Sequence, residues 1–249
     1  MKQVLSLILE AKQSGKKMLA LLIDPDKIKG DEHLEKWIQL IHHSQTDFVF
    51  VGGSLLTNNQ MDEVVKMLKA HLSVPIVLFP GNWNQISNHA DALLFLSLIS
   101  GRNPDLLIGQ HVHAAPILKT TSLEVISTGY MLIDCGRQTT ASYMSHTLPI
   151  PYNKPDIAAA TALAGEYLGM KLIYMDGGSG AEQPISRAMI KKVASAVELP
   201  IIVGGGIRTE EDAAAAYSAG ADIVVVGTAV ENEPELLFSF NEIKSQSKQ

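Results

Sequence analysis

Three glycine-rich turns in the C-terminal part of the sequence have residue types that could hold an anion. They are Asp176–Gly180, Gly204–Gly206 and Gly227-Thr228, and each follows a short apolar run. Glycine lets the backbone approach a ligand closely, and successive free N–H groups form a cradle for a phosphate. The second and third turns also precede acidic helix starts at Thr209–Asp212 and Glu231–Glu235, whose dipoles favour negative charge. Tight strand-to-helix turns are the simpler alternative, but three in succession favour a phosphate site.

A second pair of polar residues, Asp24 and Ser54, follows two apolar runs in the N-terminal part of the chain. A carboxylate and a hydroxyl at neighbouring strand ends suit a hard divalent cation that keeps several waters and binds substrate phosphates. Mg²⁺ is favoured over zinc because no His or Cys cluster stands with them. Asp26 is as good a candidate by spacing, and Asp24 could instead cap the turn that contains Pro25.

The remaining polar residues give weaker signals. His111 and His113 lie two apart, which would put both on one face of a strand, but no third ligand is evident and we expect a structural role. The single cysteine, Cys135, excludes an intrachain disulfide and a multi-cysteine metal site, and it is expected to be a packed residue at a strand end. No Cys–His or Ser–His pair indicates nucleophilic catalysis.

Eight apolar runs of strand length must position these residues, and most of them end at a polar or glycine-rich turn. The fifth run is expected to break at Gly129. The eight runs are Met18–Ile23, Phe48–Val51, Ile76–Phe79, Ala92–Leu98, Glu124–Ile133, Leu172–Met175, Ile201–Val203 and Ile223–Val226.

Periodic, charge-bearing stretches between these runs are typical of helices. Apolar strands that alternate with such helices imply a parallel sheet covered by helices, and eight of them in this length predict a modified (β/α)₈ TIM barrel. An open doubly wound sheet is the alternative, but it usually has a glycine-rich turn after the first strand, where this chain has Asp-Pro-Asp. The predicted helices are His33–Gln45, Met61–Leu72, Ile157–Leu168, Arg187–Val197 and Glu210–Ala219.

No shift in composition marks a domain boundary, so residues 1–244 are expected to form one barrel domain, with a polar tail at 245–249. The segment Asp134–Pro155 is rich in Thr, Ser and Pro and has no clear periodicity. A long irregular segment in a compact domain is more often a lid or binding loop than filler. A disordered excursion is the alternative.

The composition is that of an ordinary globular protein. The chain has 249 residues, a formal net charge of −6 and 46% hydrophobic residues. The mild acidity argues against a nucleic-acid binder, which usually carries a basic stripe. The apolar runs are too short to span a bilayer and the start lacks a signal-peptide pattern, so a cytoplasmic enzyme or binding protein is expected.

A phosphate cradle and a Mg²⁺ site suit transfer chemistry between phosphorylated substrates. They also suit a phosphosugar isomerase or lyase, although no strand ends in a lysine that could form a Schiff base, since Lys171 precedes its strand. A non-catalytic barrel that binds a phosphorylated metabolite is a third reading.

The motifs, taken together and in order, resemble those of the geranylgeranylglyceryl phosphate synthase family, which includes the heptaprenylglyceryl phosphate synthases. The resemblance covers nearly the whole chain and is closest to the second of the family's two groups, since Leu22 stands where the first group has a lysine. The matching stretches are Leu21–Asp26, Val51–Ser54, Phe79–Gly81, Ser100–Pro104, Thr128–Tyr130, Pro149–Pro155, Tyr174–Gly180, Val203–Arg208 and Val226–Thr228.

The resemblance implies a Mg²⁺-dependent prenyltransferase that joins sn-glycerol 1-phosphate to a polyprenyl diphosphate, usually geranylgeranyl diphosphate, and releases diphosphate. Asp24 and Ser54 match the family's metal ligands. Asp176 stands where many relatives have Glu, and it is the candidate catalytic residue. The positions that match the glycerol-phosphate site are Tyr174, Met175, Asp176, Gly177, Gly178, Ser179, Gly180, Gly205, Gly206, Gly227 and Thr228.

The apolar tail of such a substrate needs a groove, and Phe95, Trp83 and Tyr130 are the candidate groove residues. The resemblance also implies a homo-oligomer. A lipid product would bring the protein into transient contact with a membrane, without a transmembrane segment.

Overall fold

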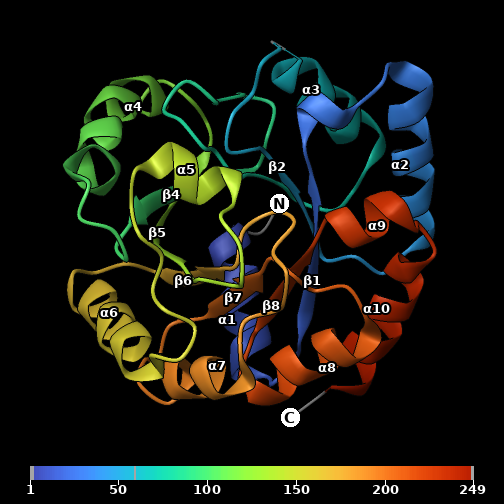
Figure 1. The fold of residues 1–249 in the computed structure, drawn as a ribbon. Coiled ribbons are helices and arrows are strands. Elements are labelled where there is room, and N and C mark those ends of the chain that lie inside the picture. The colour runs from blue at the N-terminus through green and yellow to red at the C-terminus, as the bar shows by residue number, and fades with distance from the viewer. Residues whose placement is uncertain (1–2, 59, 248–249) are drawn as a thin grey trace.

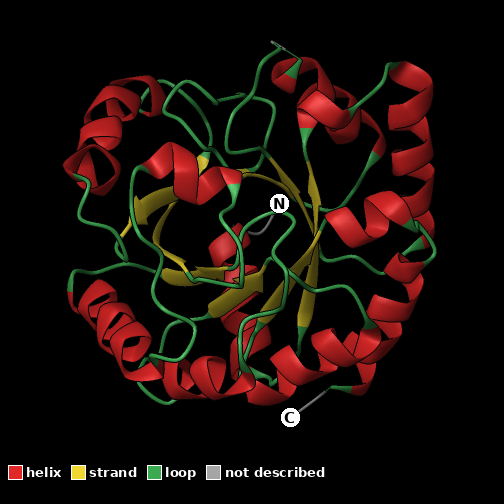
Figure 2. Ribbon diagram, viewed as in Figure 1, coloured by secondary structure: helices red, strands yellow, loops and turns green. Residues whose placement is uncertain are grey.

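The computed structural model describes residues 3–58 and 60–247, and within them eight parallel strands close into one barrel, with β8 paired to β1 (Figures 1 and 2). The predicted (β/α)₈ fold is therefore confirmed. The strands are β1 (Met18–Ile23), β2 (Phe48–Val51), β3 (Ile76–Leu78), β4 (Ala92–Leu98), β5 (Glu124–Leu132), β6 (Leu172–Asp176), β7 (Ile201–Gly204) and β8 (Ile223–Val226).

Helices surround the barrel, except between β3 and β4, where the described residues 79–91 form turns (Figure 2). No described helix has the length and apolar character needed to cross a membrane. The helices are α1 (Val4–Gln13), α2 (Asp31–His43), α3 (Met61–His71), α4 (Gln110–Leu118), α5 (Thr140–Ser145), α6 (Pro155–Tyr167), α7 (Arg187–Ala194), α8 (Glu210–Ala219), α9 (Thr228–Asn232) and α10 (Leu236–Gln246), with a 3₁₀ turn η1 (Pro25–Lys27) and a π-helical turn η2 (Asp105–Gly109).

The core has two layers because successive strand residues point to opposite faces of the sheet. Side chains such as Ala20, Phe50 and Tyr174 fill the barrel interior, while Leu21, Val49 and Met175 pack outward against the helices. Helix α1 packs against the amino ends of the strands, where Val4, Ile8 and Ala11 join the interior layer. Its first turn is tied down by the Val4 N–H, which donates to the Glu124 carboxylate at 2.5 Å. The interior is thus closed at one end, and the carboxyl end is left for a site.

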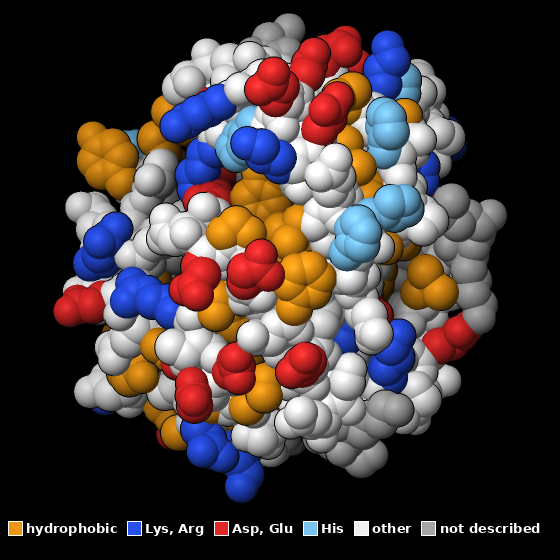
Figure 3. Space-filling view, turned by 90° about the vertical axis from the view of Figure 1, so that its right-hand side faces the viewer, with side chains coloured by type: hydrophobic (Ala, Val, Ile, Leu, Met, Phe, Trp, Pro, Cys, Tyr) orange, Lys and Arg blue, Asp and Glu red, His pale blue; other side chains and the backbone are white. Residues whose placement is uncertain are grey.

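The outer surface on the side of α2 and α9 carries acidic, basic and histidine side chains among small hydrophobic areas (Figure 3). Helix α2 follows this pattern, since it buries Leu34, Trp37, Ile38 and Ile41 and turns its charged residues outward. This is the amphipathic pattern expected of helices that cover a buried sheet.

Several strand boundaries differ from the prediction. The strand β5 runs unbroken through Gly129, which pairs with Ser97 on one side and Ile173 on the other. A Cβ at Gly129 would lie 2.8 Å from the side chains of Ile99 and Met170, so this glycine makes room for packing rather than a turn. β3 ends at Leu78, one residue early, while β6 and β7 each extend one residue further, to Asp176 and Gly204.

Helix boundaries also shift. α2 and α6 begin two residues earlier than predicted, α7 ends three residues early at Ala194, and α9 begins at Thr228 rather than at Glu231. The capping box of Thr209 and Asp212 at the start of α8 is as the sequence indicates. Residues 245–246 of the predicted tail belong to α10, and 248–249 lie outside the described residues.

The placement of His111 and His113 on a strand is wrong, because both lie on α4. His111 is buried, whereas His113 is exposed and lies beside Trp83. The segment Asp134–Pro155 is an ordered excursion rather than a disordered one: it contains α5, and Ile150 forms a bridge with Ile133.

Candidate functional site

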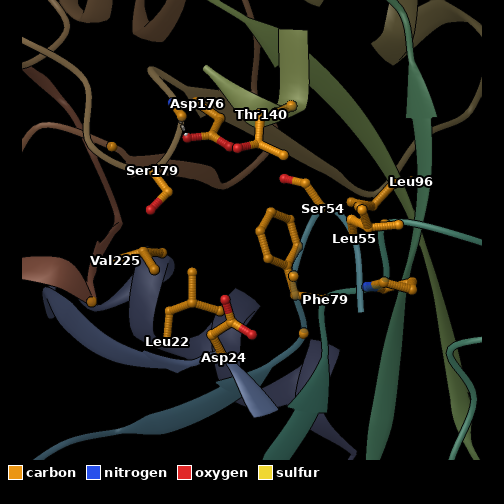
Figure 4. Close-up of a pocket in the computed structure, with 18 of the residues that line it drawn as sticks. Leu22, Asp24, Ser54, Leu55, Phe79, Leu96, Thr140, Asp176, Ser179 and Val225 are labelled. Atoms are coloured by element: carbon orange, nitrogen blue, oxygen red, sulfur yellow. Dashed lines mark hydrogen bonds between the residues drawn. The ribbon is translucent and has the colours of Figure 1, made fainter. Parts of the chain in front are cut away.

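A cavity of about 930 Å³ opens at the carboxyl ends of the strands, where the active sites of TIM-barrel enzymes lie (Figure 4). Several of the residues singled out from the sequence meet there: Asp24 follows β1, Ser54 follows β2, and Asp176 and Ser179 come from the end of β6 and the turn after it. The predicted site residues that line this cavity are Asp24, Ser54, Tyr174, Asp176, Gly178, Ser179, Gly180, Gly205, Gly206, Gly227 and Thr228.

One wall is the glycine cradle, which we define as Gly178–Gly180, Gly205-Gly206 and Gly227-Thr228. Gly178, Gly180, Gly205 and Gly206 have φ between +72° and +84°, a conformation that glycine adopts without strain. The hydroxyls of Ser179 and Thr228 lie 3.4 Å apart and bring the first and third turns together. Within the described residues, six cradle amides donate no hydrogen bond: those of Ser179, Gly180, Gly205, Gly206, Gly227 and Thr228. Free N–H groups at this density suit an anion.

Close backbone contacts fix the shape of the cradle. A Cβ on Gly205 would lie 2.6 Å from the Gly178 nitrogen and 2.9 Å from Asp176 Oδ1. The guanidinium of Arg208, which follows β7, donates to the carbonyl oxygens of Ala181 and Glu182. These bonds tie it to the turn after β6. The two turns are therefore held against each other, with no room for a side chain between them.

Asp176, the last residue of β6, is fixed by two hydrogen bonds. Its Oδ1 accepts from the Gly178 N–H at 2.7 Å, and its Oδ2 accepts from the Tyr130 hydroxyl at 2.5 Å. Burial raises the pKa of Asp176 above its ordinary value, and these two hydrogen bonds partly oppose that rise. A carboxylate oxygen has more than one lone pair, so both oxygens can accept a further hydrogen bond from a ligand.

An aromatic cluster supports Asp176 from below. The ring of Tyr174 stacks on that of Phe79, with centroids 4.9 Å apart, and Tyr130 meets both rings edge-on. Burial raises the pKa of both tyrosine hydroxyls well above the ordinary value, so Tyr130 remains a hydrogen-bond donor. The Asp176 carboxylate therefore lies against packed, uncharged aromatic side chains.

The opposite wall carries Asp24 and Ser54, and the structure distinguishes Asp24 from Asp26. The carboxylate of Asp26 faces the β2 loop, where it accepts hydrogen bonds from the Thr57 amide and hydroxyl at 2.6 and 2.7 Å. Asp24 lines the cavity, and its Oδ1 also caps η1 by accepting from the Asp26 N–H at 3.1 Å. Asp24 therefore caps the turn and also lines the cavity, so the two roles considered from the sequence do not exclude each other.

The residues around Asp24 fit a hard cation. Its Oδ2 makes no hydrogen bond to any described residue, and burial raises the pKa of the carboxyl. Gly53 keeps the β2 loop close, since a Cβ there would lie 3.2 Å from Asp24 Oδ1. No group of three or more His, Cys, Asp or Glu side chains that could hold a metal gathers anywhere among the described residues, so this site offers one carboxylate, Asp24, and the hydroxyl of Ser54. A carboxylate and a hydroxyl oxygen leave positions for water and phosphate oxygens, as Mg²⁺ requires.

The rest of the cavity wall is largely apolar. The candidate groove residues Phe95, Trp83 and Tyr130 all line it, together with leucines of β4 and with Met144 of α5, the helix that covers the mouth. His111 also lines it, with its ring edge-on to Phe95 at 4.4 Å. Burial lowers the pKa of His111, which keeps the ring neutral.

Two predicted site residues lie away from the cavity. The side chain of Met175 is fully buried in the outer layer of the core, and the Gly177 amide is used by the Gly204 carbonyl at 2.9 Å. Cys135 packs behind Gly177, and burial raises its pKa to about 12, so the thiol is an inert packed residue.

Sequence reasoning missed three features of the site: the bond between Tyr130 and Asp176, the position of Phe79, and the brace made by Arg208. The first depends on the pairing of β5 with β6, in which Tyr130 is the register partner of Tyr174, and local sequence patterns carry no signal for that pairing. Arg208 stands in a glycine motif, where its role depends on the path of a neighbouring loop.

Comparison with known proteins identifies the family. A model of the PcrB family matches residues 12–245. A protein from Spirosoma linguale named geranylgeranylglyceryl phosphate synthase is 52% identical over 233 residues, which cover 94% of this chain and 93% of that protein. One of the same name from Methanothermobacter marburgensis is 41% identical and covers 92% of each.

A solved structure agrees with these matches. The (S)-3-O-geranylgeranylglyceryl phosphate synthase from Thermoplasma acidophilum, in complex with sn-glycerol-1-phosphate, has a TM-score of 0.91 and 32% identity, and covers 100% of this chain and 99% of that one. A tryptophan synthase α subunit from Legionella pneumophila, at 17% identity and a TM-score of 0.63, shares the fold alone.

Fold and cavity define a class: (β/α)₈ enzymes with an anion cradle at the ends of their last strands. Within it, the chain belongs to the PcrB family, alongside proteins named geranylgeranylglyceryl phosphate synthase. The family resemblance seen in the sequence and the prenyltransferase class are thereby confirmed.

The contact at Gly205 yields the first prediction. Gly205→Ala should raise the KM for a glycerol phosphate about tenfold or more, because the new methyl group forces the cradle turns apart. Steady-state kinetics at saturating second substrate measure this effect. Gly169→Ala is the matched control: Gly169 has a φ of +87° but no atom within 4 Å of the added Cβ. It should cost about 1 kcal/mol of stability and leave this KM unchanged. Equal KM values for both variants would contradict the assignment of the cradle.

Proposed function

We propose that the protein transfers a prenyl group from a polyprenyl diphosphate to the C3 hydroxyl of sn-glycerol 1-phosphate. The products are a prenylglyceryl phosphate ether and diphosphate. In this proposal the glycine cradle binds the glycerol phosphate, Asp24 and Ser54 hold Mg²⁺, and the apolar wall receives the prenyl chain.

The observation that carries the proposal is the convergence of three unlike surfaces on one cavity. Cradle residues with free amides, the half-buried carboxylate of Asp24, the hydroxyl-bearing Ser54, and apolar residues such as Phe95 and Trp83 all line the same cavity. An amphiphilic diphosphate and a small phosphate ester need these three surfaces together. The relatives' names and the glycerol phosphate in the Thermoplasma acidophilum complex support the same substrates.

The reaction breaks the allylic C1–O bond, and its electron pair leaves with the diphosphate. The glycerol oxygen forms the new C–O bond, and its proton needs an acceptor. Asp176 is the proposed acceptor, because its carboxylate faces the cavity next to the cradle (Figure 4). Burial makes it a stronger base than a solvated aspartate. Its side chain is one methylene shorter than Glu, and Tyr130 and Gly178 hold it in one orientation.

Positioning supplies much of the rate, since an alcohol needs little activation against a carbon with cationic character. The cradle and Asp176 would hold the hydroxyl, and the apolar wall would exclude water that could otherwise capture the same carbon. When bound, Mg²⁺ would offset the negative charge of the diphosphate.

The direct test is an incubation of the purified protein with sn-glycerol 1-phosphate, geranylgeranyl diphosphate and Mg²⁺, with product identified by mass spectrometry. A prenyl ether with release of diphosphate is expected, and a ladder of prenyl diphosphates would give the chain length. Absence of an ether with every diphosphate from geranylgeranyl to heptaprenyl would reject the proposal.

The two aspartates after β1 allow a paired test of the metal site. Asp24→Asn should lower kcat/KM about a hundredfold or more, because an amide oxygen is a poor ligand for a hard cation. Asp26→Asn should keep most of the activity, since Asp26 serves the β2 loop. Titration of activity against Mg²⁺ is the measurement, and a normal Mg²⁺ dependence in Asp24→Asn would contradict the assignment.

Removal of the Tyr130 hydroxyl tests the role of Asp176. The hydrogen bond from Tyr130 lowers the pKa of this carboxyl, so Tyr130→Phe should raise that pKa and move the acid limb of kcat/KM to higher pH. The activity at neutral pH should fall about tenfold. Tyr174→Phe is the control, since the Tyr174 hydroxyl makes no hydrogen bond to Asp176 among the described residues. An unmoved acid limb in Tyr130→Phe would argue against Asp176 as the proton acceptor.

The proposal includes a homo-oligomer in the cytoplasm with transient membrane contact. The exposed apolar side chains Ile108 and Val112 of η2 and α4 support association between copies. The exposed side chains of Tyr143 and Leu148, near the covered mouth, support contact with a lipid surface.

A further inference from the structure

The cavity has an unfavourable charge balance for the substrates proposed above. Among the described residues, its lining carries four carboxylates, on Asp24, Asp176, Glu231 and Glu233, against two cationic side chains, Lys27 and Arg208. A diphosphate monoester carries about three negative charges near neutral pH, because its last proton leaves near pH 6. One of the two charges of a divalent cation at Asp24 is offset by the Asp24 carboxylate itself, so about two of the three diphosphate charges remain uncompensated. A second cation that faces the diphosphate would offset part of this remainder.

Arg208 is poorly placed for this role. Although Arg208 lines the cavity, its guanidinium already donates to the carbonyl oxygens of Ala181 and Glu182 in the turn after β6. The guanidinium of Arg137 also belongs to that side, since a Cβ on Gly180 would lie 2.7 Å from its Nη2. Both arginines thus stand by the glycine cradle rather than by Asp24.

Lys27 is the cationic side chain on the metal side of the cavity. It ends the 3₁₀ turn η1, three residues after Asp24, and its charge lowers the pKa of that aspartate. Its Nζ lies 3.0 Å from Oε1 and 2.7 Å from Oε2 of Glu231, on α9. This ion pair bridges the β1 loop and α9, between the metal side and the third cradle turn.

The ion pair can exchange partners at little cost. The Lys27 side chain is 45% exposed and that of Glu231 is 22% exposed. Ion pairs of this exposure stabilise a fold by only about 1 kcal/mol or less. A lysine ammonium on a flexible stem binds phosphate as a point charge, with three donors. A diphosphate next to Asp24 would therefore compete successfully with the single carboxylate of Glu231.

We propose that Lys27 binds the diphosphate leaving group, and that Glu231 holds the ammonium at the cavity rim until the diphosphate arrives. The inference rests on the proposed function. As the allylic C1–O bond breaks, its electron pair passes to the diphosphate oxygen, and the Lys27 ammonium donates a hydrogen bond to the growing negative charge. No proton needs to be transferred from Lys27, and no further reactant is required.

The test compares four variants in the prenyl-transfer assay and by inhibition with inorganic diphosphate plus Mg²⁺. Lys27→Gln should raise the KM for prenyl diphosphate and the inhibition constant of diphosphate about tenfold or more, with the KM for glycerol phosphate within about twofold. Lys27→Arg should recover most of the loss. Lys29→Gln removes the same charge from the same loop at an exposed position that does not line the cavity, and should leave all three constants unchanged.

Glu231→Gln separates ligand binding from a merely structural ion pair. It releases Lys27, so the KM for prenyl diphosphate and the inhibition constant of diphosphate should stay the same or fall. If Lys27 and Glu231 only brace the rim, both variants should lower the melting temperature alike and raise the two KM values together, and that result would overturn the inference. An unchanged inhibition constant in Lys27→Gln would also overturn it. Failure of the wild type to form any ether would reject the proposed function instead, while diphosphate binding still tests Lys27.

Discussion

The site depends on one close approach, between the backbone of Gly205 and the turn Asp176–Gly178. Strands β6 and β7 pair so that Asp176 lies beside Gly204, and the chain then turns at once with positive φ on both sides. Only hydrogen atoms fit between the two turns. This contact leaves a run of amides without partners facing the cavity, and it also sets the Gly178 N–H on the Asp176 carboxylate. The unpartnered amides of the cradle and the orientation of the carboxylate thus have the same cause.

Much of this arrangement is readable from the sequence because the strands are buried on both faces. The runs for β1, β2, β4 and β8 are predicted to the residue, since each is almost entirely apolar, with Ser97 of β4 as the exception, and β1, β2 and β8 are followed at once by Asp or Gly. The barrel follows from their number, and the cradle from its glycines. The bond between Tyr130 and Asp176 does not follow, because it requires the register of two strands whose contacting residues stand 46 positions apart. The choice of Asp24 over Asp26 likewise depends on where the β2 loop passes, which local spacing leaves open.

Helix α4 shows why periodicity can mislead. Its buried face includes a histidine, His111, while Val112 and Ile117 are exposed and Pro116 lies within the helix. Apolar residues that face outward reverse the usual pattern, so the segment has little helical signal. On the inner face of the helix, His111 packs edge-on against Phe95 at the cavity wall. On the outer face, Val112 and Ile117 remain exposed. The periodicity rule fails here because part of this helix lines the cavity and part of its apolar surface is exposed.

The carboxylates of Asp24 and Asp176 destabilise the fold, and the stability of the whole barrel must offset this cost. Burial raises the pKa of both Asp24 and Asp176, so each is held in an environment that disfavours its charged form. Their partners offset this cost only in part: Asp26 donates one amide to the first, and Tyr130 and Gly178 donate to the second. A cation at Asp24 and a hydroxyl at Asp176 would complete both sets of interactions. The free protein therefore carries an electrostatic cost that ligands relieve, and the closed barrel with its two-layer core supplies the stability to hold it.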